Sequence, residues 1–345
     1  MRGRVRFLAV GVALLVIVVL LSGFRRVTVT QFEPGPLAVK LPFGRTPDAV
    51  GRAVGIDGRV YGPLTFATNG HLTVIADTYR QRLLLIENGR ITEVPTLNQL
   101  VEDLQVSRDG DVLVADNRRL AIWMLSHGRR KKVVEFTHSD GYTEALWHLG
   151  LGRGQKLYVE MVRFGHGTFA AQLDEYLLTG RFVRRLAESK GGRQEPLTPL
   201  SDSLIGEPVR NFQVAPDGDL YVEPASLSST TRTITVYNPE GRFIRNVALR
   251  SPIAITHSDL LGVSRRGWIY LGVNLASRNH AQVLVANGDG HMVADLHVPA
   301  VDVYAATYGR VVPSGVLYLD QSTNKQYRLA TYRPVTRRVW RWGGF

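Results

Sequence analysis

A short pattern recurs along the chain, in which a turn containing glycine is followed at once by an apolar run. The runs have the composition of β-strands, as in Leu72 to Ala76 and Trp268 to Leu271. Repeats of about 20 to 50 residues are typical of units that bury their faces against copies of themselves. The turn glycines, which are 40, 44, 64, 49 and 48 residues apart, are Gly70, Gly110, Gly154, Gly218, Gly267 and Gly315.

Each repeat divides into four short strands separated by turn residues. In the second repeat these strands run from Asp103 to Ser107, Asp111 to Ala115, Leu120 to Leu125 and Lys131 to Phe136. The second strand of each repeat is apolar almost throughout, which suits a strand covered on both faces. A propeller blade provides that environment because each sheet packs between two neighbours. We therefore predict an all-β, six-bladed β-propeller of four-stranded antiparallel blades over residues 64–345.

The repeats also resemble those of the NHL-type six-bladed β-propeller. The similarity rests on Ala76-Asp77 and Ala115-Asp116 after the second strands, on Ala121-Ile-Trp123, and on Gly-Arg steps such as Gly89-Arg90. It covers about residues 64–342 and implies the fold. Propellers of this type include protein-binding, RNA-binding and enzymatic members, so the resemblance implies no single activity.

The N-terminus has the composition of a membrane anchor. Arg2, Arg4 and Arg6 precede an uncharged apolar run from Phe7 to Phe24, and Arg25-Arg26 follows it. Eighteen helical residues would extend about 27 Å, close to the thickness of a hydrocarbon core. We predict one uncleaved transmembrane helix within residues 1–26. A cleaved signal peptide is the alternative, although no small-x-small site ends the run. The positive lead places the propeller on the extracytoplasmic side of the cell membrane.

Residues 27–63 are expected to link this anchor to the propeller. Val27 to Thr30 is a candidate strand for closing the ring, whereas Pro34, Gly35 and Pro36 are expected to interrupt regular structure. We leave open whether this segment joins the last blade or that blade closes by itself.

The central channel is the expected binding site, because the first strands of all blades converge there. Carboxylate and amide oxygens in this position are suited to calcium, and the gluconolactonase/regucalcin-like propellers, to which the chain has a distant similarity, hold a divalent ion there. We predict no catalytic constellation and no cofactor, with a calcium-dependent hydrolase or lyase as the alternative. The candidate channel residues are Glu102, Asp103, His148, Asn211 and Asp259.

A basic run, Arg129, Arg130, Lys131 and Lys132, is expected at the propeller rim. The chain has a formal net charge of +12, and no cysteine is available for a disulfide or a thiolate metal site. Basic surfaces favour anionic partners. We therefore predict a monomeric binding or scaffold module for a protein or an anionic cell-envelope polymer, and not for nucleic acid.

Overall fold

Antiparallel sheet makes up nearly all of the regular structure. The computed structural model describes residues 24–55, 58–96, 100–138, 141–165, 168–188, 209–224, 229–275, 281–298, 303–304 and 307–342. Within these ranges, helix is limited to two 3-10 turns, Thr78–Arg80 and Arg153–Gln155. The same ranges contain no helix long and apolar enough to span a bilayer. Most of the predicted anchor, residues 1–23, lies outside them.

The first three sheets have four strands each, in chain order. One contains β4 (Phe66–Thr68), β5 (Leu72–Asp77), β6 (Arg82–Glu87) and β7 (Arg90–Pro95). The next contains β8 (Val101–Val106), β9 (Val112–Asp116), β10 (Ala121–Ser126) and β11 (Arg129–Glu135). The third contains β12 (Thr143–Leu151), β13 (Lys156–Gly165), β14 (Thr168–Leu177) and β15 (Phe182–Glu188).

A seven-stranded sheet follows, in which two four-stranded units share one long strand. Its strands are β16 (Val209–Val214), β17 (Leu220–Pro224), β18 (Ser229–Tyr237), β19 (Phe243–Val263), β20 (Ile269–Leu275), β21 (Ala281–Ala286) and β22 (Met292–His297). The beginning of β19 pairs with β18 and its end pairs with β20. The chain thus passes from the outer edge of one unit to the inner edge of the next without a break.

The last sheet combines both ends of the described chain. Its order is β1-β26-β25-β24, from β1 (Phe24–Pro42), β26 (Gln326–Trp342), β25 (Leu317–Asp320) and β24 (Gly309–Val311). Val27 to Thr30 therefore joins the last sheet, which decides between the two arrangements left open from the sequence. The pairing also includes Phe24 to Arg26, which had been predicted to belong to the anchor.

The expected interruption at the Pro-Gly-Pro segment of β1 is present only as a lapse in pairing, because the strand itself continues from Phe24 to Pro42. The pairing with β26 continues through Pro34 and resumes at Leu37, with register shifts on both sides of Leu37. Proline is tolerated because β1 is an edge strand, where a missing N–H costs no ladder hydrogen bond. A small three-stranded sheet is formed by β2 (Ala53–Val54), β3 (Val60–Tyr61) and β23 (Val303–Tyr304). Its first two strands come directly after this segment in the chain.

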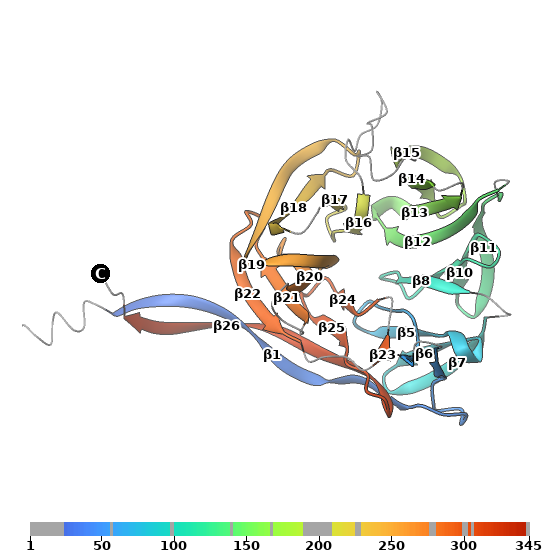
Figure 1. The fold of residues 1–345 in the computed structure, drawn as a ribbon, viewed down its shortest axis with the longest axis horizontal. Helices are drawn as coiled ribbons and strands as arrows, with labels where there is room; N and C mark the ends of the chain where they lie inside the picture. The colour runs from blue at the N-terminus through green and yellow to red at the C-terminus, as the bar shows by residue number, and fades with distance from the viewer. Residues whose placement is uncertain are drawn as a thin grey trace, which may run out of the picture.

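The sheets stand around a common centre, and strands such as β8, β16 and β24 lie on the inside (Figure 1). Inner strands of successive sheets contact one another from β4 through β8, β12, β16 and β19 to β24. Buried apolar side chains fill the spaces between neighbouring sheets. One such cluster joins Phe66 and Ile75 of the first sheet to Tyr318 and Leu329 of the last, which closes the ring.

The central strands confirm the expected burial on both faces. All five residues of β9 are buried. The six turn glycines predicted from the repeat have φ values from 68° to 98°, a range that L-residues rarely adopt. The prediction that these six glycines lie in turns is therefore confirmed.

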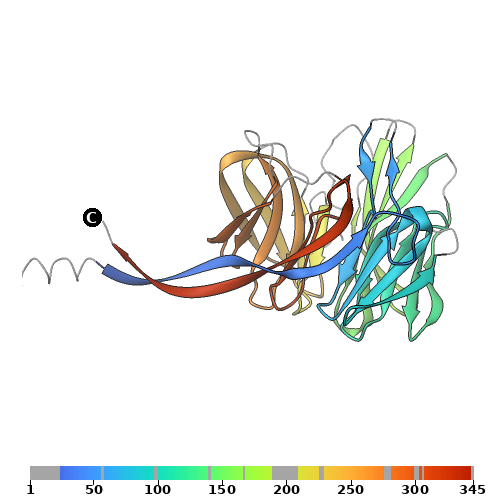
Figure 2. The ribbon, with the colours of Figure 1, turned by 90° about the horizontal axis from the view of Figure 1, so that it is seen from below.

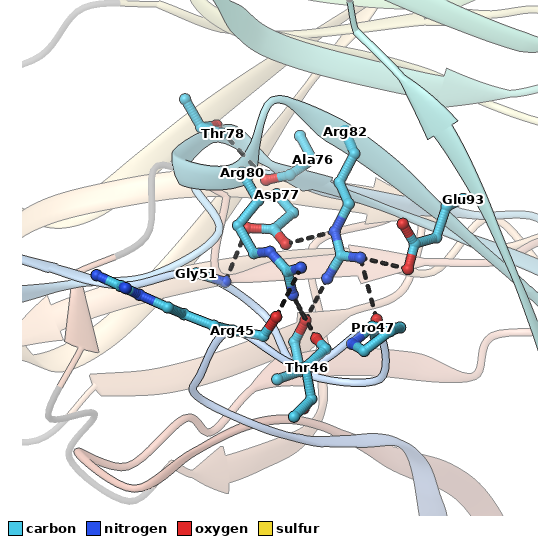
Figure 3. Close-up of polar contacts among 11 residues, drawn as sticks. Arg45, Thr46, Pro47, Gly51, Ala76, Asp77, Thr78, Arg80, Arg82 and Glu93 are labelled. Atoms are coloured by element: carbon cyan, nitrogen blue, oxygen red, sulfur yellow. Dashed lines mark hydrogen bonds and ion pairs between the residues drawn. The ribbon is translucent and has the colours of Figure 1, made fainter.

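A buried arginine fixes the loop after β1 onto the first sheet (Figure 3). Arg82 Nε lies 3.0 Å from Asp77 Oδ2, and the same guanidinium donates to the carbonyls of Pro47 and Ala49. Asp77 Oδ1 accepts from the Gly51 amide at 2.9 Å. These charge-assisted contacts hold the loop where the first and last sheets meet.

Candidate functional site

The inner strands bring together a polar group, which we call the axial cluster: Glu102, Asp103, His148, Glu160 and Arg310. Glu102 and Asp103 lie on β8, His148 on β12, Glu160 on β13 and Arg310 on β24. Three of the five predicted channel residues belong to it. The cluster draws on three different sheets, so it exists only in the closed ring.

An ion pair joins two of these sheets. Arg310 Nη2 donates to Asp103 Oδ1, and both residues are at least nine-tenths buried. The other oxygen of Asp103, Oδ2, accepts from the Leu149 amide at 2.8 Å. Arg310 Nε is buried without a hydrogen-bond partner among the described residues. The guanidinium therefore retains a donor that Asp103 does not use.

His148 forms a close pair with a buried carboxylate. Its Nδ1 lies 2.5 Å from Oε2 of Glu160, which is 1% exposed, whereas 30% of the histidine side chain is accessible. Burial lowers the pKa of His148, but the charge and hydrogen bond of Glu160 and the charge of Asp103 outweigh it and raise the pKa. A carboxylate that accepts from Nδ1–H leaves the Nε2 lone pair available as a base.

Glu102 is the second glutamate of the axial cluster. Burial and the neighbouring Asp103 charge raise the pKa of Glu102, against the smaller effects of His148 and of a long contact with Asn117, 3.5 Å. A raised pKa makes a carboxyl group easier to protonate than an exposed one, which suits Glu102 to donate a proton. The cluster thus places a proton acceptor near a proton donor.

The other two predicted channel residues do not join the axial cluster. Asn211 on β16 is buried, and its Oδ1 has no hydrogen-bond partner in the described part of the chain. Asp259 on β19 pairs instead with His257, with Nε2 and Oδ2 3.1 Å apart. Neither bonds to Glu102, Asp103 or His148 within the described ranges, so the predicted set is brought together only in part.

The calcium alternative does not fit this donor arrangement. Within the described ranges, no group of three or more His, Asp or Glu side chains is placed to hold a metal ion. Asp103 already binds the Arg310 cation and a backbone amide, and Asp259 binds His257. Because these oxygens are used by protein donors, we derive no step through a metal.

The basic run lies on β11, the outer edge strand of its sheet, as predicted. Arg129, Lys131 and Lys132 are exposed, and Lys132 pairs with Glu135. Arg130 stacks over the Trp123 ring at 4.3 Å, and burial and the Arg119 charge lower its pKa. Three of the four cations are therefore exposed at the rim, and one of them is already paired with an acid.

One position in the repeat carries an acid in most sheets, and its role differs from sheet to sheet. Asp77 binds Arg82, Glu160 binds His148 and Glu223 accepts from Ser258. In the fifth repeat the position is Gly272, and a Cβ there would lie 1.3 Å from the Tyr308 hydroxyl oxygen. Tyr308 thus fills the space of the missing side chain.

Two members of the axial cluster were not among the predicted site residues. Glu160 was visible as the repeated acid after a second strand, but nothing local assigned it to His148. Arg310 follows Gly309 on a three-residue inner strand and has no distinctive spacing. Its role depends on the contact with Asp103, 207 residues away.

Comparisons with known proteins support a distant β-propeller relationship. No family model and no curated protein matches the chain. Among solved structures, a luciferin-regenerating enzyme has a TM-score of 0.50 at 10% identity, covering 88% of this chain and 95% of that one. A streptogramin B lyase has a TM-score of 0.49 at 10% identity, covering 89% and 98%. A calcium-binding protein, regucalcin, from Agrobacterium tumefaciens has a TM-score of 0.49 at 12% identity, covering 82% and 95%.

Proposed function

We propose that the protein is an enzyme, a six-bladed propeller hydrolase or lyase in which His148 transfers a proton at the axis of the ring. The count of six takes the two units that share β19 as separate blades. The observation that carries the proposal is the pairing of His148 with the buried Glu160 carboxylate.

The three ionisable groups would have distinct roles. His148 Nε2 removes a proton from a substrate carbon or from an attacking water, while Glu160 holds the ring and stabilises the imidazolium. Protonated Glu102 supplies a proton to the leaving group. The Arg310 charge, which acts on His148 across the cluster, stabilises the oxygen on which negative charge develops. One proton is taken and one is returned, and no covalent intermediate is needed.

The test compares two histidines that each pair with a carboxylate. The full chain is assayed on a panel of lactones and esters by proton release, and on compounds able to undergo elimination by the absorbance of the new double bond. His148→Gln is expected to reduce kcat/KM by roughly 100-fold or more, as for loss of a general base. His257→Gln removes the exposed histidine bound to Asp259 and should leave turnover unchanged. Turnover that survives His148→Gln, or no turnover on any compound, would contradict the proposal.

We further propose that the propeller is held at a membrane by residues 1–26 and faces the extracytoplasmic side. The course of β1 supports this, because the strand begins at the end of the apolar run, at the point farthest from the ring, and runs from there to the ring (Figure 2). Reporter fusions at the C-terminus test the topology, and release of the intact chain from membranes by high salt alone would contradict anchoring.

A binding role at the rim is compatible with this location. The exposed cations of β11 support binding of an anionic envelope polymer. Polyglutamate serves as the probe, and the triple variant Arg129→Gln, Lys131→Gln, Lys132→Gln is expected to weaken its binding by about 10-fold or more. Unchanged binding by this variant would assign the affinity to another surface.

A further inference from the structure

Both ends of the described chain form a two-stranded ribbon that extends beyond the sheets. We call residues 24–31 of β1 and 335–342 of β26 the distal ribbon; it runs from the pair Gln31 and Val335 to the pair Phe24 and Trp342. Pairing of β26 with β25 ends at Tyr332, and the Phe32 ring lies 5.8 Å from Tyr270. Beyond these contacts the ribbon projects from the ring in both views (Figures 1 and 2).

A ribbon of this kind has little stability of its own. Two strands bury no core between them, and isolated pairs are marginal in water. Within the distal ribbon each described strand pairs only with the other, so both outer edges lack a further strand. Such edges are normally covered or protected by charge. The ribbon is therefore expected to be more stable against a partner surface than in bulk water.

The composition of the distal ribbon identifies that surface. It contains five arginines, no acid and three large aromatics, Phe24, Trp340 and Trp342. Aromatic residues with arginine are enriched at the boundary between lipid and water, and clustered cations bind anionic headgroups. The five arginines are Arg25, Arg26, Arg337, Arg338 and Arg341.

The strand register connects this composition to the apolar segment. Trp342 is paired with Phe24 and Trp340 with Arg26, so the end of β26 lies beside the end of the apolar run. If that run enters a bilayer, the backbone pairing holds the C-terminal strand at the same boundary. Eight strand residues extend about 26 Å, which is the length of ribbon that can contact the surface.

We propose that the distal ribbon lies on an anionic lipid surface, with the arginines of β26 against the headgroups. The proposal rests on the membrane attachment proposed above and adds a second, C-terminal contact to it. It also explains why the two chain ends pair well beyond what closing the ring requires.

The absence of cysteine from the sequence makes a site-specific test direct. Thr28→Cys places a spin label on the exposed ribbon, and Phe243→Cys places one on the ring, where the side chain is 59% exposed. The full chain is reconstituted in nanodiscs of phosphatidylglycerol and phosphatidylcholine. Collision with a nickel chelate attached to lipid headgroups is then measured by electron paramagnetic resonance. We expect at least a several-fold higher collision rate for the ribbon label than for the ring label.

Charge removal identifies the lipid contact. Arg337→Gln, Arg338→Gln and Arg341→Gln together should bring the ribbon label towards the ring value. In discs of phosphatidylcholine alone, the unchanged ribbon should give a correspondingly lower rate. Equal collision rates for the two labels in anionic discs would overturn the proposal, as would a short distance between ribbon labels of two copies, which indicates strand pairing between chains.

Failure of the anchor is distinguishable from failure of the ribbon. If the chain does not float with vesicles, the attachment proposed for residues 1–26 is wrong, and this inference with it. If the chain floats while the ribbon label meets only aqueous relaxants, the anchor stands and the ribbon proposal is wrong.

Discussion

Asp103 and Arg310 form an ion pair between the inner strands β8 and β24, although 207 residues separate them in the chain. Their sheets lie on either side of the first sheet, so the pair connects parts of the ring that share no strand. The contact thus stabilises the closed arrangement and positions the guanidinium near His148.

Loss of one partner should destabilise the protein more than loss of both. Asp103→Asn leaves the Arg310 cation buried without its counter-ion and should lower the free energy of unfolding by about 3 kcal/mol. The double variant Asp103→Asn, Arg310→Met removes both charges and should be less destabilised than Asp103→Asn alone. Urea unfolding measures both effects. Lys132→Gln, which breaks a surface pair with Glu135, is the control and should cost less than about 1 kcal/mol.

The His148 and Glu160 pair makes a prediction about titration. Nuclear magnetic resonance of the ring should give His148 a pKa above 6.5, because the Glu160 and Asp103 charges outweigh burial. The pKa of His148 is higher in the folded state than in the unfolded state. The stabilisation from the pair is therefore complete at pH values below the unfolded pKa, and it is lost as pH rises through the folded pKa. Glu160→Gln should lower the His148 pKa, because less negative charge then opposes the lowering of the pKa by burial. Glu135→Gln, on the edge strand β11, should not change it.

The repeating architecture could be predicted because its signals are local. Turn glycines and apolar second strands can be recognised within each repeat. The predicted strand boundaries of the second repeat agree with those of β8 to β11 to within about two residues. The path of β1 through Pro34 could not be predicted from the same signals. Proline normally interrupts a strand, and only the edge position of β1 makes it tolerable.

The candidate site was harder to predict because it is assembled from distant strands. Inner-strand position brought Glu102, Asp103 and His148 into consideration, but Arg310 could be identified only from its three-dimensional contact. Because the sequence contains no local catalytic motif, it favours a binding role. The pairing of His148 with Glu160 in the structure favours proton transfer instead. Asn211 and Asp259 occupy similar strand positions, but Asp259 pairs with His257 and Asn211 Oδ1 has no hydrogen-bond partner among the described residues.

Asp320 predicts an unusual pH dependence of stability. Burial raises the pKa of this carboxyl to about 6, despite hydrogen bonds from Ser322. The folded state then binds a proton at Asp320 more tightly than the unfolded state, so the contribution of this group to stability is greatest below about pH 4 and is lost as pH rises through about 6. Asp320→Asn should raise the free energy of unfolding at pH 7.5 by about 2 to 3 kcal/mol.

The pH series contains its own control. Below about pH 4 the Asp320→Asn chain and the natural chain should have similar stability, because both side chains are then neutral. Asp289→Asn, in an exposed turn, should follow the natural curve throughout. A constant difference between Asp320→Asn and the natural chain at all pH values would assign the effect to packing.

Gly272 and Tyr308 should be coupled, because the tyrosine hydroxyl occupies the space of the missing side chain. A Cβ at position 272 would lie 1.3 Å from the hydroxyl oxygen and 2.3 Å from the ring carbon that bears it, so Gly272→Ala forces the tyrosine to move. Overpacking of this kind costs about 1 to 3 kcal/mol. In a Tyr308→Ala background the same substitution should cost less than about 0.5 kcal/mol, since the space is open. Gly44→Ala is the control, because its Cβ would lie 3.5 Å from Ala49, an ordinary contact. Denaturant unfolding of the four chains in the cycle measures the coupling, and additive effects would show that Tyr308 does not fill this position.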